Sequence, residues 1–231
     1  MKSTVVNHPS DTLSGLPRPN SLAGSVYDAI FAQLMSLQIP PGARITVDTL
    51  VRELNVSHTP IREALGRLEG EGLVLRAHLV GYRAAPQVSR DRFDELYELR
   101  LMLEPEAAAK AAARMDEAGL VALDQLAGVM ATTNDGGDER LRYSDFARQD
   151  AEFHDKILDI AGNGLMRDVL RMQHTHFHIF RLMYHRLVTV EALDEHEALM
   201  AALRRGDPQL AREAMRIHIQ NSRTRLLPAF A

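Results

Sequence analysis

The 231-residue chain contains no cysteine. Without a thiol it can form neither a disulfide framework nor a metal site with thiolate ligands. It also lacks any apolar run close to the roughly 20 residues that a membrane-spanning helix requires. The first ten residues include no apolar segment of the kind found in signal peptides. These absences favour a soluble cytoplasmic protein with no membrane partner, and the length allows one or two domains.

The chain has no excess of positive charge either, since its formal net charge is −4. That value argues against a protein that coats nucleic acid in bulk. Residues 21–83 are neutral, with six arginines and six carboxylates, namely Arg44, Arg52, Arg62, Arg67, Arg76 and Arg83 against Asp28, Asp48, Glu53, Glu63, Glu69 and Glu71. If this segment binds DNA, its specificity must depend on where a few arginines lie.

The first 20 residues are rich in serine, proline, asparagine and threonine, and their apolar residues show no periodicity. We interpret them as a flexible arm. From residue 21 onwards, apolar residues recur at three- and four-residue steps, which predicts a helix that ends before Pro40. Thr46 can cap a second, short helix, and Asn55 ends it.

A third helix is predicted within Asn55–Val74, with Ser57 or Thr59 as its cap. Its apolar residues fall on one helix face and are Ile61, Ala64, Leu65 and Leu68. His58 and Arg62 are four residues apart, so they share a face turned away from these apolar residues. A short helix of this kind suits the major groove of DNA, although ordinary surface helices show the same pattern.

After Gly72, strand-like runs at residues 73–76 and 82–85 flank residues 77–81, which predicts a β-hairpin. Three helices followed by a hairpin is the order of a winged helix-turn-helix. The motifs of this segment resemble those of the GntR family of bacterial transcription regulators over residues 22–85. The matching motifs are Pro41-Gly-Ala-Arg-Ile45, Val56-Ser-His-Thr-Pro-Ile-Arg-Glu-Ala-Leu65, Leu68-Glu-Gly-Glu-Gly-Leu-Val74 and Gly81.

The resemblance implies that the third helix and the tip of the hairpin bind a double-stranded DNA operator. The residues that it places against DNA are Ser57, His58, Thr59, Arg62, Arg67, His78 and Gly81. Two positions depart from the family pattern, because most members carry arginine in place of His58 and many carry a cation in place of Asp48. Arginine binds guanine through two hydrogen bonds, so its loss predicts an unusual operator or weaker binding.

A winged domain at residues 21–85 and a linker at residues 86–92 are followed by a sequence that is helical almost to residue 231. The helices predicted there span residues 92–114, 116–132, 141–161, 165–185, 189–205 and 209–227, with Thr189 as a cap and a loop at residues 133–138. About six helices joined by short loops predict an antiparallel bundle. The expected fold is therefore mostly α, with a winged N-terminal domain and an all-helical C-terminal domain.

Asp150 and His154 are four residues apart, so on a helix both side chains can bind the same ion. Alone this spacing is weak evidence, because an Asp–His pair on a helix surface is more common. His196 and His218 lie on two later predicted helices among apolar neighbours, which suggests that both point inward.

This second part resembles the FCD domain, the helical effector domain of FadR-type GntR regulators, over roughly residues 90–225. The matching motifs are Leu99-Arg-Leu-Met-Leu-Glu104, Asp150-x-x-Phe-His154, Glu195-His196, Gly206-Asp207 and Ala214-Met-x-x-His218. The resemblance implies a divalent metal held by Asp150, His154, His196 and His218. Nitrogen and oxygen donors without sulfur suit zinc, which we expect, and also nickel, manganese or iron(II).

The resemblance also implies a small effector, a carboxylic or sugar acid. Arg100 is the candidate to bind its carboxylate, because the guanidinium fork matches that group. An ion pair with Glu104 on the helix surface accounts for Arg100 equally well.

A histidine-rich stretch follows the first two candidate ligands. On one continuous helix, the side chains that form a single stripe are His174, His178, Arg181 and His185, while His176 faces elsewhere. We expect His178 and Arg181 to line the effector pocket. In the alternative interpretation, His174 and His178 are themselves metal ligands.

These observations predict a ligand-responsive transcription regulator, by default a repressor released by its effector, and not an enzyme. As a homodimer it would bind a near-palindromic operator. The alternative is a metal-dependent hydrolase in which the Asp/His site activates water. That reaction gives the N-terminal motifs no role. Its only candidates for a general acid or base are Glu152 and Glu195. A helical scaffold that binds metal but no effector is a third interpretation.

Overall fold

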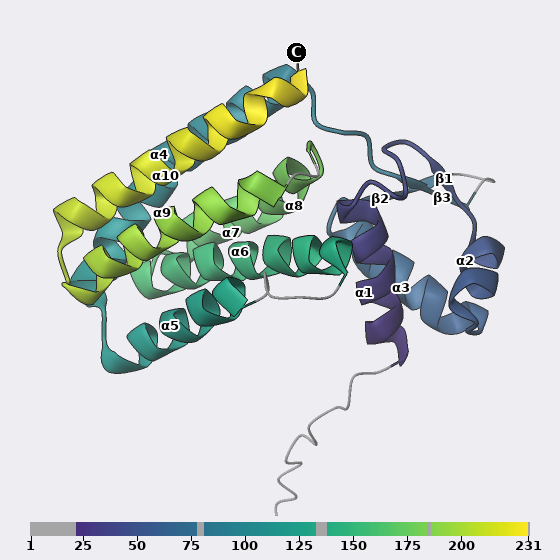
Figure 1. The fold of residues 1–231 in the computed structure, drawn as a ribbon, viewed down its shortest axis with the longest axis horizontal. Helices are drawn as coiled ribbons and strands as arrows, with labels where there is room; N and C mark the ends of the chain where they lie inside the picture. Colours follow the sequence, from purple (N-terminus) through teal and green to yellow (C-terminus); the bar gives the residue numbers. More distant parts are fainter. Residues whose placement is uncertain (1–21, 78–80, 133–137, 184–185, 231) are drawn as a thin grey trace, which may run out of the picture.

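The computed structural model describes residues 22–77, 81–132, 138–183 and 186–230. These residues form a winged segment and a larger helical bundle, which lie on the right and left of Figure 1. The predicted N-terminal arm, the proposed DNA contact His78 and the predicted loop at residues 133–137 lie outside the described residues.

The winged segment has the three predicted helices and the predicted hairpin. Its elements are α1 (Leu22–Met35), β1 (Arg44–Ile45), α2 (Val47–Leu54), α3 (His58–Gly70), β2 (Val74–Ala77) and β3 (Gly81–Ala84). Thr46 caps α2 by accepting a hydrogen bond from the backbone N–H of Thr49. Asn55 ends α2 in the left-handed conformation, with φ of 51°. Both local predictions are therefore confirmed.

Strand β1 was not predicted. It adds a third, antiparallel strand beside β3, with Arg44 opposite Arg83 and Ile45 opposite Tyr82. A two-residue strand has no recognisable alternation of its own, so only its pairing with a distant strand defines it. Strand β2 packs against α3, and Ile30, Ile61 and Leu65 are fully buried in the core of the segment.

The bundle confirms the predicted fold class. Its helices are α4 (Arg90–Arg114), α5 (Glu117–Thr132), α6 (Glu139–Ala161), α7 (Gly164–Met172), α8 (Thr175–Phe180), α9 (Arg186–Arg204) and α10 (Pro208–Leu226), followed by a 3₁₀ turn at Leu227–Phe230. Helices α4 and α10 lie side by side along one edge (Figure 1). They run antiparallel, because Arg223 pairs with Asp94 at one end and Arg212 with Glu106 further along.

Three predicted boundaries in the bundle were wrong. The helix expected at residues 165–185 is two helices, because α7 ends at Met172 and His174 takes a left-handed conformation with φ of 44°. Helix α9 begins at Arg186, so the start predicted at Thr189 is too late. Helix α4 begins within the expected linker, at Arg90, where the Ser89 hydroxyl accepts a hydrogen bond from the backbone N–H of Arg92.

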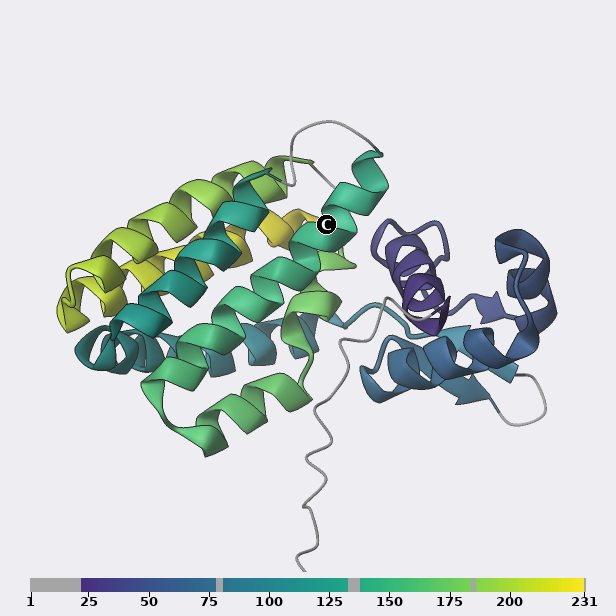
Figure 2. The same cartoon turned by 90° about the horizontal axis from the view of Figure 1, so that it is seen from below.

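Helix α1 joins the two parts of the molecule, because it packs against both α3 and α6. Figure 2 shows α1, in purple, between the bundle and the rest of the winged segment. Arg148 of α6 pairs with Asp28 of α1 at 2.9 Å and lies over the ring of Phe31. Phe31 also meets Phe177 of α8 edge to face, with 5.1 Å between the ring centroids.

Among the helices of the described residues, none is both long enough and apolar enough to cross a lipid bilayer.

Candidate metal centre

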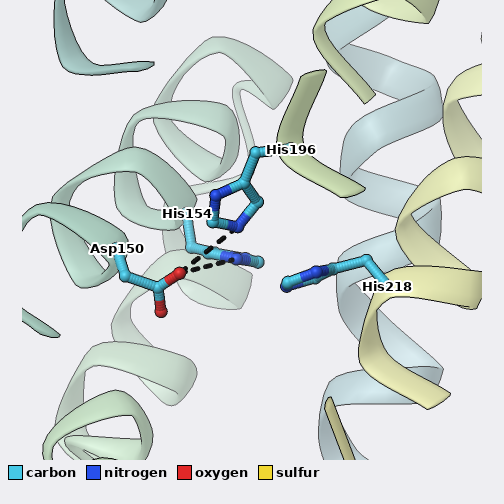
Figure 3. A group of neighbouring side chains, drawn as sticks. All are labelled: Asp150, His154, His196 and His218. Atoms are coloured by element: carbon cyan, nitrogen blue, oxygen red, sulfur yellow. Dashed lines mark ion pairs between the residues drawn. The ribbon is translucent and has the colours of Figure 1, made fainter. Parts of the chain in front are cut away.

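The four predicted metal ligands meet in the middle of the bundle. Asp150 and His154 project from successive turns of α6, His196 from α9 and His218 from α10 (Figure 3). All four are buried, and one donor atom from each lies within 4.8 Å of the others. The sequence spacing thus placed Asp150 and His154 on one helix face, and packing of the three helices brings His196 and His218 beside them.

The donors face one another without enough hydrogen-bond partners. The Nε2 atom of His154 and both ring nitrogens of His196 are buried and have no hydrogen-bond partner in the described part of the chain. His196 Nε2 lies 3.2 Å from Asp150 Oδ1, and His154 Nε2 lies 4.0 Å from the same oxygen. Buried polar atoms left unpaired are rare, because each costs about 1–3 kcal/mol.

Burial keeps the imidazoles in the form that binds metals. It lowers the pKa of His154 to about 3 and that of His218 to about 4, so both rings are neutral at neutral pH. Burial alone would raise the pKa of Asp150, but its contacts with His176 and His196 hold that pKa well below its usual value. Neutral imidazole and ionised carboxylate are the protonation states in which these groups ligate a metal.

Two of the ligand histidines are oriented in the same way. His154 Nδ1 lies 2.6 Å from Glu104, and Glu104 pairs with Arg100 at 2.6 Å. His218 Nδ1 lies 2.8 Å from Glu195, which pairs with Arg225. A carboxylate that accepts the Nδ1–H of a histidine fixes its tautomer and leaves Nε2 to bind the metal.

His176 is a member of the site that the sequence analysis missed. Its Nδ1 lies 2.7 Å from Asp150 Oδ2, the carboxylate oxygen on the other side from His154 and His196. The prediction that His176 faces elsewhere assumed one continuous helix. The break at His174 rotates the chain, so that His176 turns toward the metal ligands.

The arrangement fits a divalent metal. Atoms bound to one ion at roughly 2 Å lie at most about 4 Å apart, so the observed spacing of up to 4.8 Å requires only a small inward movement of the side chains. An ion there would satisfy His154 Nε2 and one of the two unpaired nitrogens of His196. Three imidazoles and one carboxylate suit zinc and also nickel, manganese or iron(II). The alternative ligand pair of His174 and His178 is absent from this cluster.

Arg100 is paired with Glu104, as one of the two interpretations held, but the pair is buried rather than on the surface. Arg100 also borders a small cavity with Asp150, His218, Ser222 and Arg225. The cavity has a volume of about 10 Å³, which is room for about one water molecule.

A much larger cavity, of about 760 Å³, lies between the bundle and the winged segment. Glu104, His154 and His176 lie at its inner end, and Tyr27 and Arg67 of the winged segment form its far wall. The Thr175 hydroxyl is buried at this cavity and has no hydrogen-bond partner within the described residues. Its volume falls within the range of cavities that hold small-molecule ligands.

His178 and Arg181 line neither of these two cavities. His178 instead lies against Gly72, at the end of α3. Arg181 is buried and donates a hydrogen bond to the backbone carbonyl of Ala85, directly after the wing. Both residues therefore lie where α8 meets the winged segment, and the expected stripe of histidines along a single helix was wrong.

The residues proposed to contact DNA do not all lie on one face of α3. Ser57, His58, Thr59 and Arg62 are exposed at the N-terminal end of α3, and the Ser57 side chain makes no capping hydrogen bond. Arg67 lies nine residues after His58, two and a half helical turns, so it projects from the opposite side. Its guanidinium lies 4.0 Å from the centre of the Tyr27 ring, facing the large cavity. Gly81 begins β3 with φ of 96°.

The chain matches two family models in the order that the fold suggests. Residues 22–83 match the bacterial regulatory proteins of the gntR family, and residues 95–221 match the FCD domain. The chain belongs to the GntR family. Its C-terminal half is an FCD domain. Members of this family are transcriptional regulators that bind DNA, so the hydrolase interpretation is not supported.

Relatives of this GntR regulator are similar along most of their length. The transcriptional regulator YdhC of Bacillus subtilis is 24% identical over 89% of this chain and 91% of its own. The probable D-xylose utilization operon transcriptional repressor of Paenarthrobacter nicotinovorans is 27% identical over 86% of each chain. The solved structure of McbR/YncC from Escherichia coli shares the fold, with a TM-score of 0.66 and 22% identity over 91% of this chain and 99% of that one.

Replacement of either later histidine tests the metal assignment. We expect His196→Ala and His218→Ala each to lose bound metal, because each removes one of four donors and leaves the others unsatisfied. Metal content of the purified proteins, measured by elemental analysis per mole of chain, checks this. His58→Ala, an exposed histidine of the winged segment, is the control and should keep the wild-type content. Full occupancy in both variants would reject the ligand set.

Proposed function

We propose that this GntR regulator is a cytoplasmic homodimer whose helical domain holds one divalent metal and a small organic acid. The proposal rests mainly on one observation. Asp150, His154, His196 and His218 meet in a buried cluster in which several ring nitrogens have no hydrogen-bond partner within the described residues. The domain division we propose is a winged domain at residues 21–85, a linker at 86–92 and an effector domain at 93–231. Repression relieved by the effector is the proposed default, in keeping with a relative described as a probable repressor.

The carboxylate and the three imidazoles would hold the metal, which we propose is zinc. When bound, it supplies a Lewis acid that attracts a carboxylate. The chain itself contributes orientation: Glu104 and Glu195 hold two of the imidazoles, and Arg100 and Arg225 hold those carboxylates in turn. Arg100 thus acts on the effector site through Glu104, and Arg225 takes the corresponding place on α10.

The effector would occupy the larger cavity. The space beside Arg100 admits only about one water, whereas the cavity beside His154 and His176 has the volume of a metabolite site. Arginines and carboxylates both line it, together with the unpaired Thr175 hydroxyl, which suits an acid that also carries hydroxyl groups. Because Tyr27 and Arg67 form one wall, an effector there would contact the winged domain directly.

Helix α8 would transmit binding to the DNA-binding domain. Its residue His176 contacts Asp150, one of the proposed metal ligands. The next residue, Phe177, packs on Phe31 of α1. At the end of α8, Arg181 donates a hydrogen bond to the backbone carbonyl of Ala85. Gln87 in turn donates a hydrogen bond to the carbonyl oxygen of Arg181. A change at the metal therefore has a short, packed route to the winged domain.

The contact of Arg181 with the backbone of Ala85 has a cost in free energy, because it buries a guanidinium. Burial lowers the pKa of Arg181 to about 10, and two of its guanidinium nitrogens, Nε and Nη1, have no hydrogen-bond partner in the described chain. A buried cation without a carboxylate partner disfavours the arrangement that buries it. A modest difference in effector affinity between two arrangements can then shift the equilibrium between them.

The DNA-binding assignment is tested by Arg62→Ala. We expect operator binding to be lost, because the exposed guanidinium of Arg62 makes no ion pair within the described residues and is free to contact DNA. Fold and dimer should be unchanged in circular dichroism and size-exclusion measurements. Lys156→Ala, which removes one partly exposed cation from α6, is the control and should bind the upstream DNA as the wild type does in a gel shift. Unchanged affinity of Arg62→Ala would remove this residue from the interface.

The effector assignment is tested by a thermal-shift screen of metal-loaded protein against small carboxylates and sugar acids. We expect at least one acid to raise the melting temperature of the wild type, since a ligand that binds the folded state stabilises it. The same acid should leave His218→Ala unchanged. No response to any acid, with chelators still lowering the melting temperature, would favour a metal-stabilised scaffold without effector.

The route through α8 is tested with Phe177→Ala. We expect removal of metal by a chelator to weaken operator binding of the wild type by roughly tenfold, a typical coupling between sites. In Phe177→Ala, removal of the metal should weaken operator binding only about twofold, because the contact with Phe31 is lost. The variant should still bind metal before the chelator is added. Leu165→Ala, an exposed leucine of α7, is the control. An equal loss of operator binding in Phe177→Ala and the wild type would exclude this contact from the route.

A further inference from the structure

The two positions at which the sequence departs from the GntR pattern contact each other. His58 is the first residue of α3, and Asp48 lies in the first turn of α2. Nε2 of His58 is 2.9 Å from Oδ1 of Asp48, while the side chains remain 57% and 83% exposed. The contact therefore links the two helices of the helix-turn-helix on an open surface, where a DNA base can still approach the imidazole.

The contact fixes which nitrogen of His58 carries hydrogen. A carboxylate only accepts hydrogen bonds, so Nε2 must donate to Asp48. In a neutral imidazole the other nitrogen, Nδ1, is then an acceptor. Without Asp48, the ring could take either tautomer and present a donor or an acceptor to DNA.

An acceptor selects among bases in the major groove. Adenine and cytosine each present an amino group there, which can donate to Nδ1. Guanine presents only the acceptors N7 and O6, which an arginine binds well and an acceptor nitrogen does not. The pairing of His58 with Asp48 thus reverses the preference that arginine would give at this position.

We propose that Asp48 is a specificity-determining residue that makes His58 select adenine or cytosine in the operator. The inference rests on the proposed function, since it requires the N-terminal end of α3 to face the major groove. Asp48 acts as a positioning residue, because it holds the imidazole and need not touch a base itself.

The same carboxylate weakens binding overall. The winged segment is already neutral, and a negative side chain near the phosphates opposes the attraction that drives non-specific binding. Asp48 therefore has two separable effects: its charge lowers affinity for all sequences, and its hydrogen bond discriminates between bases. An exposed carboxylate nearby that makes no hydrogen bond to His58 should lower the affinity for all sequences without discriminating between bases.

Selection from an operator library, randomised over each half-site, separates these effects. The base pair that His58 contacts is the one whose preference disappears in His58→Ala. At that pair we expect the wild type to favour adenine or cytosine over guanine by roughly fivefold, as for one base-edge hydrogen bond. Asp48→Ala should reduce the preference to less than about twofold and raise overall affinity. Glu53→Ala, which removes another exposed carboxylate of α2, should raise affinity and leave the preference unchanged.

A second pair of variants tests the acceptor role. His58→Arg should gain only a weak guanine preference, because Asp48 pairs with the new guanidinium. The double variant His58→Arg with Asp48→Ala should prefer guanine by roughly tenfold, since the freed guanidinium can bind N7 and O6. Equal guanine preference with and without Asp48 would show that the two residues do not interact on DNA.

The outcomes distinguish this inference from the proposed function. A guanine preference in the wild type, or an unaltered preference in Asp48→Ala, would overturn the role of Asp48 while Arg62→Ala still abolished binding. If His58→Ala and Arg62→Ala both left operator binding unchanged, the proposed DNA-binding face itself would be wrong.

Discussion

Three imidazoles and one carboxylate are enclosed in the bundle with too few hydrogen-bond partners, and this shortage governs the rest of the structure. Each unpaired buried atom costs about 1–3 kcal/mol, and the cluster contains three, on His154 and His196. A divalent ion would satisfy two of them at once, His154 Nε2 and one nitrogen of His196. Because the donors come from α6, α9 and α10, the ion would also stabilise the packing of these helices.

Two ion pairs orient imidazoles of the cluster. Arg100, Glu104 and His154 form one buried chain, and Arg225, Glu195 and His218 form a second on the other side. Loss of the arginine or the glutamate alone would leave its partner's charge buried and uncompensated, which is more costly than loss of both. The chains thus hold the imidazoles rigidly, whereas His176 ties Asp150 to the short helix α8. We infer that α8 is the movable part of the site, because it also contacts the winged segment.

Local patterns in the sequence sufficed for most of the fold. Helical periodicity and motif order predicted the winged segment and the bundle, because each depends on spacing within one helix or on a motif. The resemblance to the FCD domain supplied the four residues that the structure brings together. The break before α8 was missed, since the left-handed turn at His174 has no glycine to mark it. His176 was missed for a different reason, as was the role of Glu104 and Glu195 in orienting the histidines: the partners of these residues lie 23–50 residues away in sequence. Only tertiary packing brings such groups together.

The central claim is that one divalent metal lies between Asp150, His154, His196 and His218. Anomalous diffraction from crystals of metal-loaded protein, collected on both sides of the absorption edge of the metal, tests it most directly. We expect a single strong anomalous peak per chain, about 2.0–2.2 Å from the aspartate oxygen and from one nitrogen of each histidine. The absence of a peak there, or a peak with other ligands, would contradict it.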